Sequence, residues 1–261
     1  MDFTLCAYGE PEELQFLPKI QEYVDGIELQ NFIRKGVASP QGWQTVLKQH
    51  CDFAEKIDGR LILHGPFSGI QFDCFDHLLN EAVRRRMNMV YDAANRLRPD
   101  TLVLHSGCSD ILVRFGLTES WLKQTADFWR REIDRYAEIG ITVVIENVVE
   151  PAADTLIALA DLVGNEHFGL CLDVGHVNLC SEIPPAQWIS AMGPRIKHVH
   201  LHDNHGTLDD HLPTGSGSID FDPIFTALKT HVPEVTVSLE VLADPQTVIE
   251  NIIRITEAYR S

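Results

Sequence analysis

The stretch "IKHVHLHDNHGTLDDHLPTGSGSID", Ile196–Asp220, carries the pattern that decides the fold. Its first residues alternate between apolar and polar side chains, which is the period of a β-strand with two different faces. Val199 and Leu201 would point toward covering helices. The opposite face would carry three histidines, His198, His200 and His202.

Short apolar runs of the same kind recur along the chain and alternate with longer amphipathic stretches. The candidate strands are Thr4–Ala7, Gly26–Leu29, Leu61–His64, Thr101–His105, Thr142–Glu146, Phe168–Asp173, Ile196–His202 and Val235–Val241. The stretches between them have helical periodicity, as in residues 76–99, 118–140 and 245–261. Eight β–α units predict an α/β protein that forms a single (β/α)8 TIM barrel domain over residues 1–261. A doubly wound open sheet is the alternative, which the strand count and the lack of a GxGxxG phosphate loop disfavour.

Acidic or histidine side chains end six consecutive candidate strands, from the third to the eighth. By alternation these side chains point into the barrel: His64, His105, Glu146, Asp173, His200 and Glu240. The carboxyl ends of barrel strands form the mouth where barrel enzymes keep their active sites. Clustered carboxylates are costly unless positive charge compensates them, and divalent metal ions bind both carboxylate oxygen and imidazole nitrogen. The pattern therefore predicts a metal site at this mouth.

Other histidines and a cysteine have simpler interpretations. His198, deeper on its strand, is expected to be a hydrogen-bonded interior residue, and Cys171 is expected to contribute packing. The roles of His202 and His205 stay open, with His202 either a metal ligand or a substrate contact. Four histidines on predicted helices or helix–strand junctions are expected at the surface: His50, His77, His167 and His231.

The composition restricts the setting in which the protein works. The net charge of -17 disfavours nucleic acid as a partner, because nucleic acid is a polyanion. No run of 18 apolar residues suggests a membrane span, and the first residues lack a secretory signal. The six cysteines include no CxxC pair, which is typical of reduced thiols in a cytoplasmic protein. We expect a cytoplasmic protein, either monomeric or oligomeric, with a small-molecule substrate.

Seven short motifs occur in the order and at the strand positions of a known superfamily. They are "HGPF" at His64, "LHSG" at His105, "IEN" at Glu146, "LDVGH" at Asp173, "HVHLHDN" at His200, "DDHLPTGSGSIDF" at Asp209 and "LEV" at Glu240. With these motifs the chain resembles the xylose isomerase-like barrel superfamily, which includes sugar isomerases, sugar epimerases and endonuclease IV-type apurinic endonucleases. The resemblance covers nearly the whole chain and implies a divalent metal cofactor, such as Zn, Mn, Mg or Co.

The resemblance implies two alternative ligand sets. Isomerases and epimerases of the superfamily hold one ion with four residues, which correspond here to Glu146, Asp173, His200 and Glu240. The endonuclease branch holds three ions with nine residues, and the five additional ones correspond to His64, His105, His176, Asp209 and His211. One to three bound ions are therefore expected.

The hypothesis favoured by the acidic composition is an isomerase or epimerase of a small sugar or sugar phosphate. One ion would polarise the carbonyl and stabilise an enediolate, Glu146 and Glu240 would act as the acid and base, and His176 would hold a hydroxyl. The chain departs from several ketose epimerases after the "HLHD" strand, where their arginine is missing from the sequence "NHG" at 204–206.

The alternative is an endonuclease IV-like zinc phosphoesterase that uses all nine ligands on an abasic site or a small phosphoester. The "GSGS" loop, Gly215–Ser218, is either a phosphate cradle or an ordinary tight loop. A metal-dependent binding protein without turnover is disfavoured by the convergent acid and base side chains. A Schiff-base aldolase is also disfavoured, because Lys197 would point away from the barrel interior.

Overall fold

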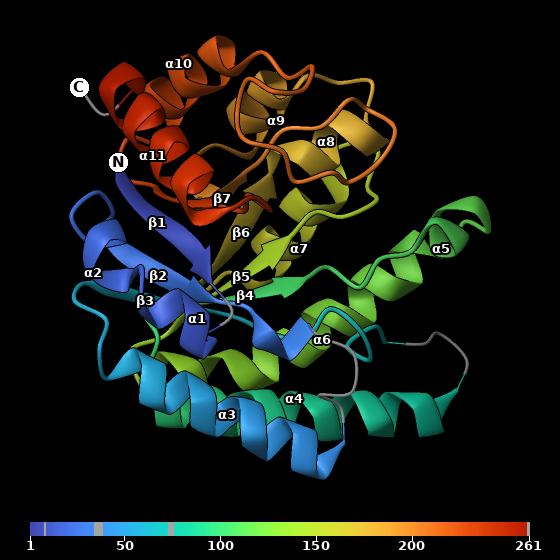
Figure 1. Cartoon of the computed structure of the whole chain (residues 1–261). Coiled ribbons are helices and arrows are strands. Elements are labelled where there is room, and N and C mark those ends of the chain that lie inside the picture. The colour runs from blue at the N-terminus through green and yellow to red at the C-terminus, as the bar shows by residue number, and fades with distance from the viewer. Residues whose placement is uncertain (8, 34–38, 73–75, 260–261) are drawn as a thin grey trace.

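The strands of the computed structural model close into a ring in the order of the sequence, each parallel to its neighbours (Figure 1). They are β1 (Asp2–Ala7), β2 (Gly26–Leu29), β3 (Arg60–His64), β4 (Thr101–His105), β5 (Thr142–Glu146), β6 (Phe168–Asp173), β7 (Ile196–Leu201) and β8 (Thr236–Leu239). The pairing of β1 with β8, where Asp2 lies opposite Thr236, closes the ring. The structure describes residues 1–7, 9–33, 39–72 and 76–259. The predicted (β/α)8 barrel is confirmed.

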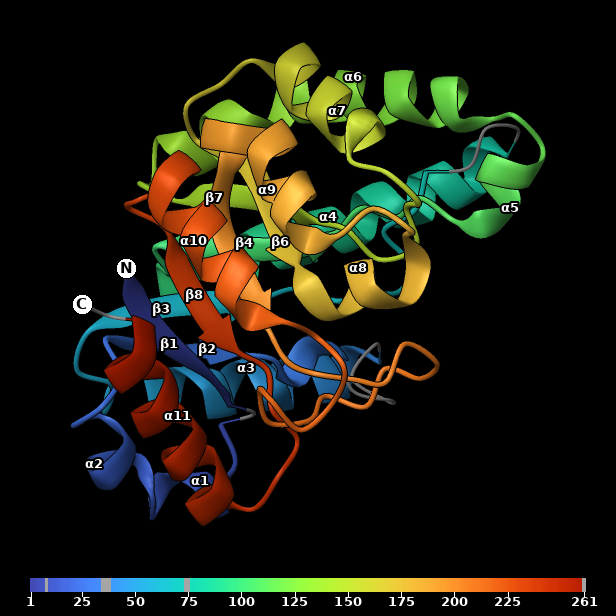
Figure 2. The same ribbon diagram turned by 90° about the horizontal axis from the view of Figure 1, so that it is seen from above.

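Helices surround this ring, as Figure 2 shows from above. They are α1 (Pro11–Leu14), α2 (Leu17–Ile20), α3 (Pro40–Ala54), α4 (His77–Leu97), α5 (Asp110–Arg114), α6 (Thr118–Ala137), α7 (Asp154–Val163), α8 (Val174–Cys180), α9 (Pro185–Met192), α10 (Phe221–His231) and α11 (Pro245–Tyr259). Two 3₁₀ turns, η1 (Asn31–Ile33) and η2 (Gly193–Arg195), complete the elements. The predicted helix over 245–261 begins as expected at Pro245, and its last two residues lie outside the described part of the chain.

The ends of two strands differ from the prediction in a way that matters for the site. Strand β7 ends at Leu201 and β8 at Leu239, whereas the apolar alternation extended them to His202 and Val241. His202 and Glu240 therefore lie just beyond the strands, where the chain turns over the mouth. The backbone N–H of Glu240 still donates to the carbonyl of Leu201 on β7 at 3.0 Å, so the neighbouring strand continues to hold Glu240 in place.

The apolar core has two layers that follow the two faces of the strands. The larger layer lies between the ring and the helices, and it contains Val199 and Leu201 as predicted. A small second layer fills the barrel interior and consists of Ile62, Val103, Val144 and Cys171. The expectation that Cys171 contributes packing is confirmed. This inner layer fills the barrel interior, so no channel runs through the described part of the barrel. The polar residues at the carboxyl ends of the strands therefore lie at the bottom of a closed mouth.

One of the four histidines expected at the surface is buried. His50 on α3 has no exposed surface, and its ring meets Phe32 edge to face with centroids 5.1 Å apart. The buried residues of α3 include Trp43, Val46 and Leu47, and His50 follows them at helical spacing on the same face. The surface prediction for His50 was wrong because helix periodicity, and not polarity, decides which face is covered.

No helix in the described part of the chain has the length and apolar character needed to cross a membrane.

Candidate metal centre

The nine side chains predicted as possible ligands lie together at the carboxyl ends of the strands. Each has a nitrogen–oxygen contact of 3.7 Å or less with another member of the set. The set consists of His64, His105, Glu146, Asp173, His176, His200, Asp209, His211 and Glu240. Sheet register accounts for part of this proximity, because His105 lies opposite Glu146 and Asp173 lies opposite His200 on neighbouring strands.

Glu146 connects two groups of nitrogen donors through its two carboxylate oxygens. Its Oε2 atom lies 3.1 Å from Nε2 of His64 and 3.4 Å from Nε2 of His105. Its Oε1 atom lies 3.2 Å from Nδ1 of His200. The carboxylate of Glu146 thus has histidine nitrogens near both of its oxygens, so it could contribute to more than one ion if metal were bound.

The second donor group surrounds Nδ1 of His200. Besides Glu146, this nitrogen has Glu240 Oε2 at 3.4 Å and Asp173 Oδ2 at 3.8 Å. The group has one nitrogen and three carboxylate donors, a set that suits divalent ions of intermediate hardness such as Zn²⁺ or Mn²⁺.

A third group combines His176 on α8 with Asp209 and His211 from the loop between β7 and α10. Asp209 Oδ2 lies 3.4 Å from Nε2 of His176 and 3.1 Å from Nε2 of His211. The D-x-H spacing brings Asp209 and His211 to the same point because His211 takes a left-handed backbone conformation with φ 48°.

The histidine rings are held so that one nitrogen of each is available to a metal. The Nδ1–H groups of His64, His176 and His211 donate to the backbone carbonyls of Gly65, Asn147 and Glu240 at 2.8, 2.9 and 2.8 Å. A carbonyl only accepts, so in the neutral rings Nε2 carries the lone pair, and that atom faces the cluster. Metal-binding histidines are fixed in this way by the partner of their second nitrogen.

Asp173 provides a second test of whether these residues fit a metal. Its Oδ1 atom accepts from the backbone N–H of His176 at 2.7 Å and from Nε2 of His202 at 3.1 Å. Its Oδ2 atom is buried and has no hydrogen-bond partner among the described residues. An unpaired buried carboxylate oxygen is costly. An ion bound at Oδ2 would remove that cost, so the residues present fit a divalent metal.

Charges within the cluster couple metal binding to the loss of protons. Burial would lower the pKa values of His64, His176 and His200, but neighbouring carboxylates raise them. Burial alone would raise the pKa of Asp173, but His176 and His202 outweigh it and lower the pKa to about 2. Burial lowers the pKa of His105 to about 4, so this ring is neutral near pH 7. Burial would lower the pKa of His211, but its hydrogen bond with Asp209 raises the pKa to about 9. His211 therefore has to lose a proton before it can bind an ion.

His202, whose role the sequence left open, is packed inside the cluster. It is fully buried, donates to Asp173, and stacks on His211 with centroids 4.0 Å apart. Its ring occupies the space beside Gly175, where a Cβ atom would lie 2.0 Å from Cε1 of His202. His205, by contrast, is exposed. The structure places His202, and not His205, in contact with the candidate ligands Asp173 and His211.

The "GSGS" loop is an ordinary tight loop and not an anion cradle. The Oδ2 atom of Asp203 accepts from the backbone N–H groups of Gly215 at 2.9 Å and Gly217 at 2.8 Å, and its Oδ1 atom accepts from that of Ile219 at 3.1 Å. A buried carboxylate of the chain therefore takes the amides that a phosphate would need.

Glu28 on β2 is a central residue of the site that the sequence interpretation missed. It is fully buried and accepts from Nε2 of His198 at 3.1 Å, from Nε2 of His200 at 3.1 Å and from Oγ of Ser238 at 2.5 Å. The expectation that His198 is a hydrogen-bonded interior residue is confirmed. Strand alternation could have found Glu28, because Ile27 and Leu29 on either side belong to the outer core.

Comparison with known proteins agrees with this architecture. The chain belongs to the xylose isomerase-like TIM barrel family, whose family model matches residues 24–258. It is 25% identical over 214 residues to an uncharacterized protein of Methanocaldococcus jannaschii, covering 74% of this chain and 68% of the relative. It is 24% identical over 206 residues to a probable endonuclease 4 of Mycobacterium leprae, covering 74% of this chain and 78% of the relative.

Two solved structures share the fold over the full length of both chains. A D-tagatose 3-epimerase-like protein superposes with a TM-score of 0.73 at 19% identity, covering 100% of each chain. A protein of Thermus thermophilus, soaked with ZnCl2, also superposes with a TM-score of 0.73, at 22% identity and 100% coverage of each chain. At these identities the likeness establishes the fold.

Proposed function

We propose that the protein is a multinuclear, divalent-metal-dependent phosphoester hydrolase. One observation carries the proposal: one oxygen of Glu146 faces the nitrogens of His64 and His105 at 3.1 and 3.4 Å, and its other oxygen faces the single nitrogen Nδ1 of His200 at 3.2 Å. Adjacent ions bridged by a carboxylate are typical of phosphatases and nucleases, where one ion acidifies water and the other stabilises the leaving oxygen. The relationship to a probable endonuclease 4 supports the same reaction class.

The nine candidate ligands would form three metal-binding groups according to their positions. Glu146, with His64 and His105, would hold one ion, and its other oxygen would hold a second ion together with Asp173, His200 and Glu240. His176, Asp209 and His211 would hold a third. The side chains of His105, Asp209 and His211 are 20, 41 and 21% exposed, whereas those of the remaining donors are 11% exposed or less. A substrate would therefore approach from the side of these three residues.

The surroundings of the mouth favour a small phosphoester over DNA. Phe67, Leu208 and Leu242, on three of the loops that follow the strands, are exposed, and the Phe67 ring lies 5.8 Å from that of His105. The chain as a whole carries a net charge of -17. A long polyanion would be repelled by the surface, whereas a short ester with an apolar part would contact these side chains.

A sugar isomerase or epimerase is the second candidate, and a different observation favours it. Glu146 Oε1 and Glu240 Oε2 lie 3.2 and 3.4 Å from the same His200 nitrogen. With one ion at that nitrogen, the two carboxylates would flank a bound ketose and could remove and return a proton. This reaction needs no ion at His64, His105, Asp209 or His211.

Metal content and two assays separate the candidates. Protein purified without added metal is expected to contain two or three zinc ions per chain and to cleave bis(p-nitrophenyl) phosphate in preference to an abasic oligonucleotide. The variant that combines Asp209→Asn with His211→Gln should lose an ion and most of this activity. One exchangeable ion per chain, with solvent deuterium entering a ketose and with that activity retained in the double variant, would establish the isomerase instead.

A further inference from the structure

Four histidines of the metal centre have one ring nitrogen facing the other donors and the second held by an acceptor. For His64, His176 and His211 the acceptor is a backbone carbonyl. For His200 it is the carboxylate of Glu28, whose two oxygens lie 3.1 and 3.2 Å from Nε2. His200 is therefore turned the opposite way, with Nδ1 toward the carboxylates of the second donor group.

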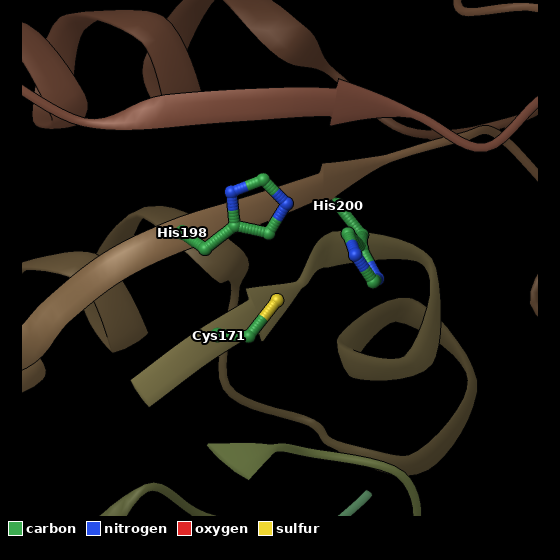
Figure 3. A group of neighbouring side chains, drawn as sticks. All are labelled: Cys171, His198 and His200. Atoms are coloured by element: carbon green, nitrogen blue, oxygen red, sulfur yellow. The ribbon is translucent and has the colours of Figure 1, made fainter. Parts of the chain in front are cut away.

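The barrel floor holds Glu28 in place from several strands. Its neighbours across the sheet are Cys6 on β1 and Ile62 on β3. Ser238 on β8 and His198 on β7 donate to it from strands beyond β1. Figure 3 shows His198 and His200 projecting from the same side of β7 into the interior, close to Cys171 of β6. The carboxylate is thus fully hydrogen-bonded before any metal arrives.

We propose that Glu28 is the positioning residue that holds His200 with a proton on Nε2, so that the Nδ1 lone pair is directed at the metal. This inference rests on the proposed metal centre. A carboxylate is a stronger acceptor than a carbonyl, and it makes the imidazole that donates to it a more basic ligand. His200 is the ligand that needs this strength, because it is the single nitrogen donor among three carboxylates in its group.

The group of Cys171, His198 and His200 is not a separate metal site in this arrangement. Their donor atoms lie within 4.8 Å of one another. However, Cys171 packs against Ile62, Val103 and Val144, and burial raises the pKa of its thiol far above the ordinary range. A thiol binds zinc as the thiolate. Nε2 of His200 is meanwhile committed to Glu28.

The test compares two buried glutamates that undergo the same substitution. Glu28→Gln keeps the shape of the side chain and removes its charge. It should weaken binding of one zinc ion ten- to a hundredfold, measured by competition with a chromophoric chelator, and leave the other ions unchanged. Glu150→Gln is the matched control. Glu150 is buried in the loop between β5 and α7, and it accepts from the backbone N–H groups of Val148 and Val149. This variant should bind zinc like the native protein.

His200→Gln separates failure of this inference from failure of the metal centre. If His200→Gln loses one ion while Glu28→Gln binds every ion with native affinity, the role of Glu28 is refuted and the centre stands. If His200→Gln also binds zinc like the native protein, the proposed centre itself is wrong.

A second measurement needs no substitution at Glu28 and therefore does not depend on whether that variant folds. Long-range ¹H–¹⁵N correlation spectra of histidine-labelled protein report which nitrogen of each ring carries the proton. In the zinc-loaded protein, where ligand histidines carry a single ring proton, His200 should be in the Nε2–H form, and His64, His176 and His211 in the Nδ1–H form. An Nδ1–H form of His200 would overturn the inference.

Discussion

Two buried histidines show how the surroundings of a side chain decide its role. Both ring nitrogens of His200 lie next to carboxylates: Nε2 next to Glu28, and Nδ1 next to the candidate ligand Glu146. Neither ring nitrogen of His50 has a hydrogen-bond partner within the described residues. Burial lowers the pKa of His50 to about 3 from the ordinary value of 6.5. The same residue type is thus a candidate ligand in one place and a source of acid sensitivity in the other.

Replacing His50 should make the protein less sensitive to acid. Between pH 6.5 and 3 the unfolded chain protonates His50 and the folded chain does not, so stability falls as the pH is lowered. From pH 7.5 to 5.0 the native protein should lose about 2 kcal/mol more unfolding free energy than His50→Phe, at about 1.4 kcal/mol per pH unit below 6.5. Urea unfolding at both pH values measures this difference.

The exposed His77 offers a control for the same experiment. His77→Phe should keep the pH dependence of the native protein. An equal loss of stability in the native protein and in His50→Phe would show that His50 accepts a proton in the folded state.

At the scale of elements, the turn from β6 into α8 organises the centre. Asp173 ends the strand and caps the helix by accepting from the backbone N–H of His176, which returns the His176 ring to the mouth. Gly175 lies between them and leaves room for the His202 ring. Strand, cap and glycine together bring the side chains of Asp173, His176 and His202 to one point.

Gly175→Ala should disrupt this arrangement. The new Cβ atom would lie 2.0 Å from Cε1 of His202, and the fully buried ring has little space to move. We expect a loss of about 1–3 kcal/mol in unfolding free energy, typical of overpacking, and weaker zinc binding.

Gly206→Ala is a control in which the nearest atoms lie 3.7 Å away. Because Gly206 has a φ of 74°, this variant should lose stability through backbone strain and retain zinc affinity. Native zinc affinity in Gly175→Ala would contradict the role assigned to this turn.

Strand alternation predicted most of the fold and the directions of most donors, because a period of two residues fixes which face each side chain occupies. The sequence interpretation missed two features that the pattern of strand ends does not reveal. Alternation does point Glu28 into the barrel, but its strand has only four residues, belongs to no recognisable motif and ends in Leu29 rather than in His, Asp or Glu. The amides of "GSGS" are taken by Asp203, a long-range pairing that no local pattern reveals. The site residues remain predictions, which metal analysis has to test.

At the scale of the whole molecule, the donors join strands around most of the ring. The nine candidate ligands come from β3 through β8 and the loops that follow them. An ion that binds only the folded chain stabilises it by mass action. Bound metal should therefore act as a cross-link between strands.

Metal removal should lower the melting temperature. At a free zinc concentration of about a thousand times the dissociation constant, binding contributes about 4 kcal/mol, which corresponds to on the order of 10 °C for a chain of this size. Calorimetry of the protein before and after dialysis against a chelator measures the shift. Glu146→Gln, which removes the charge of a proposed ligand, should show a smaller shift in melting temperature on metal removal. Equal melting temperatures with and without metal would refute this linkage.

Closure of the ring also determines when the centre can form during biosynthesis. Glu28 near the start of the barrel meets His198, His200 and Ser238 from its last two strands, and β1 pairs with β8 between Asp2 and Thr236. Contacts between such distant segments form late, because the long loop has to be closed first. A nascent chain that has not yet added β8 lacks Glu240 and the floor contact of Ser238, although it already carries most of the histidines. The ligand set of the proposed metal centre is therefore complete only after β8 has been added and the ring has closed.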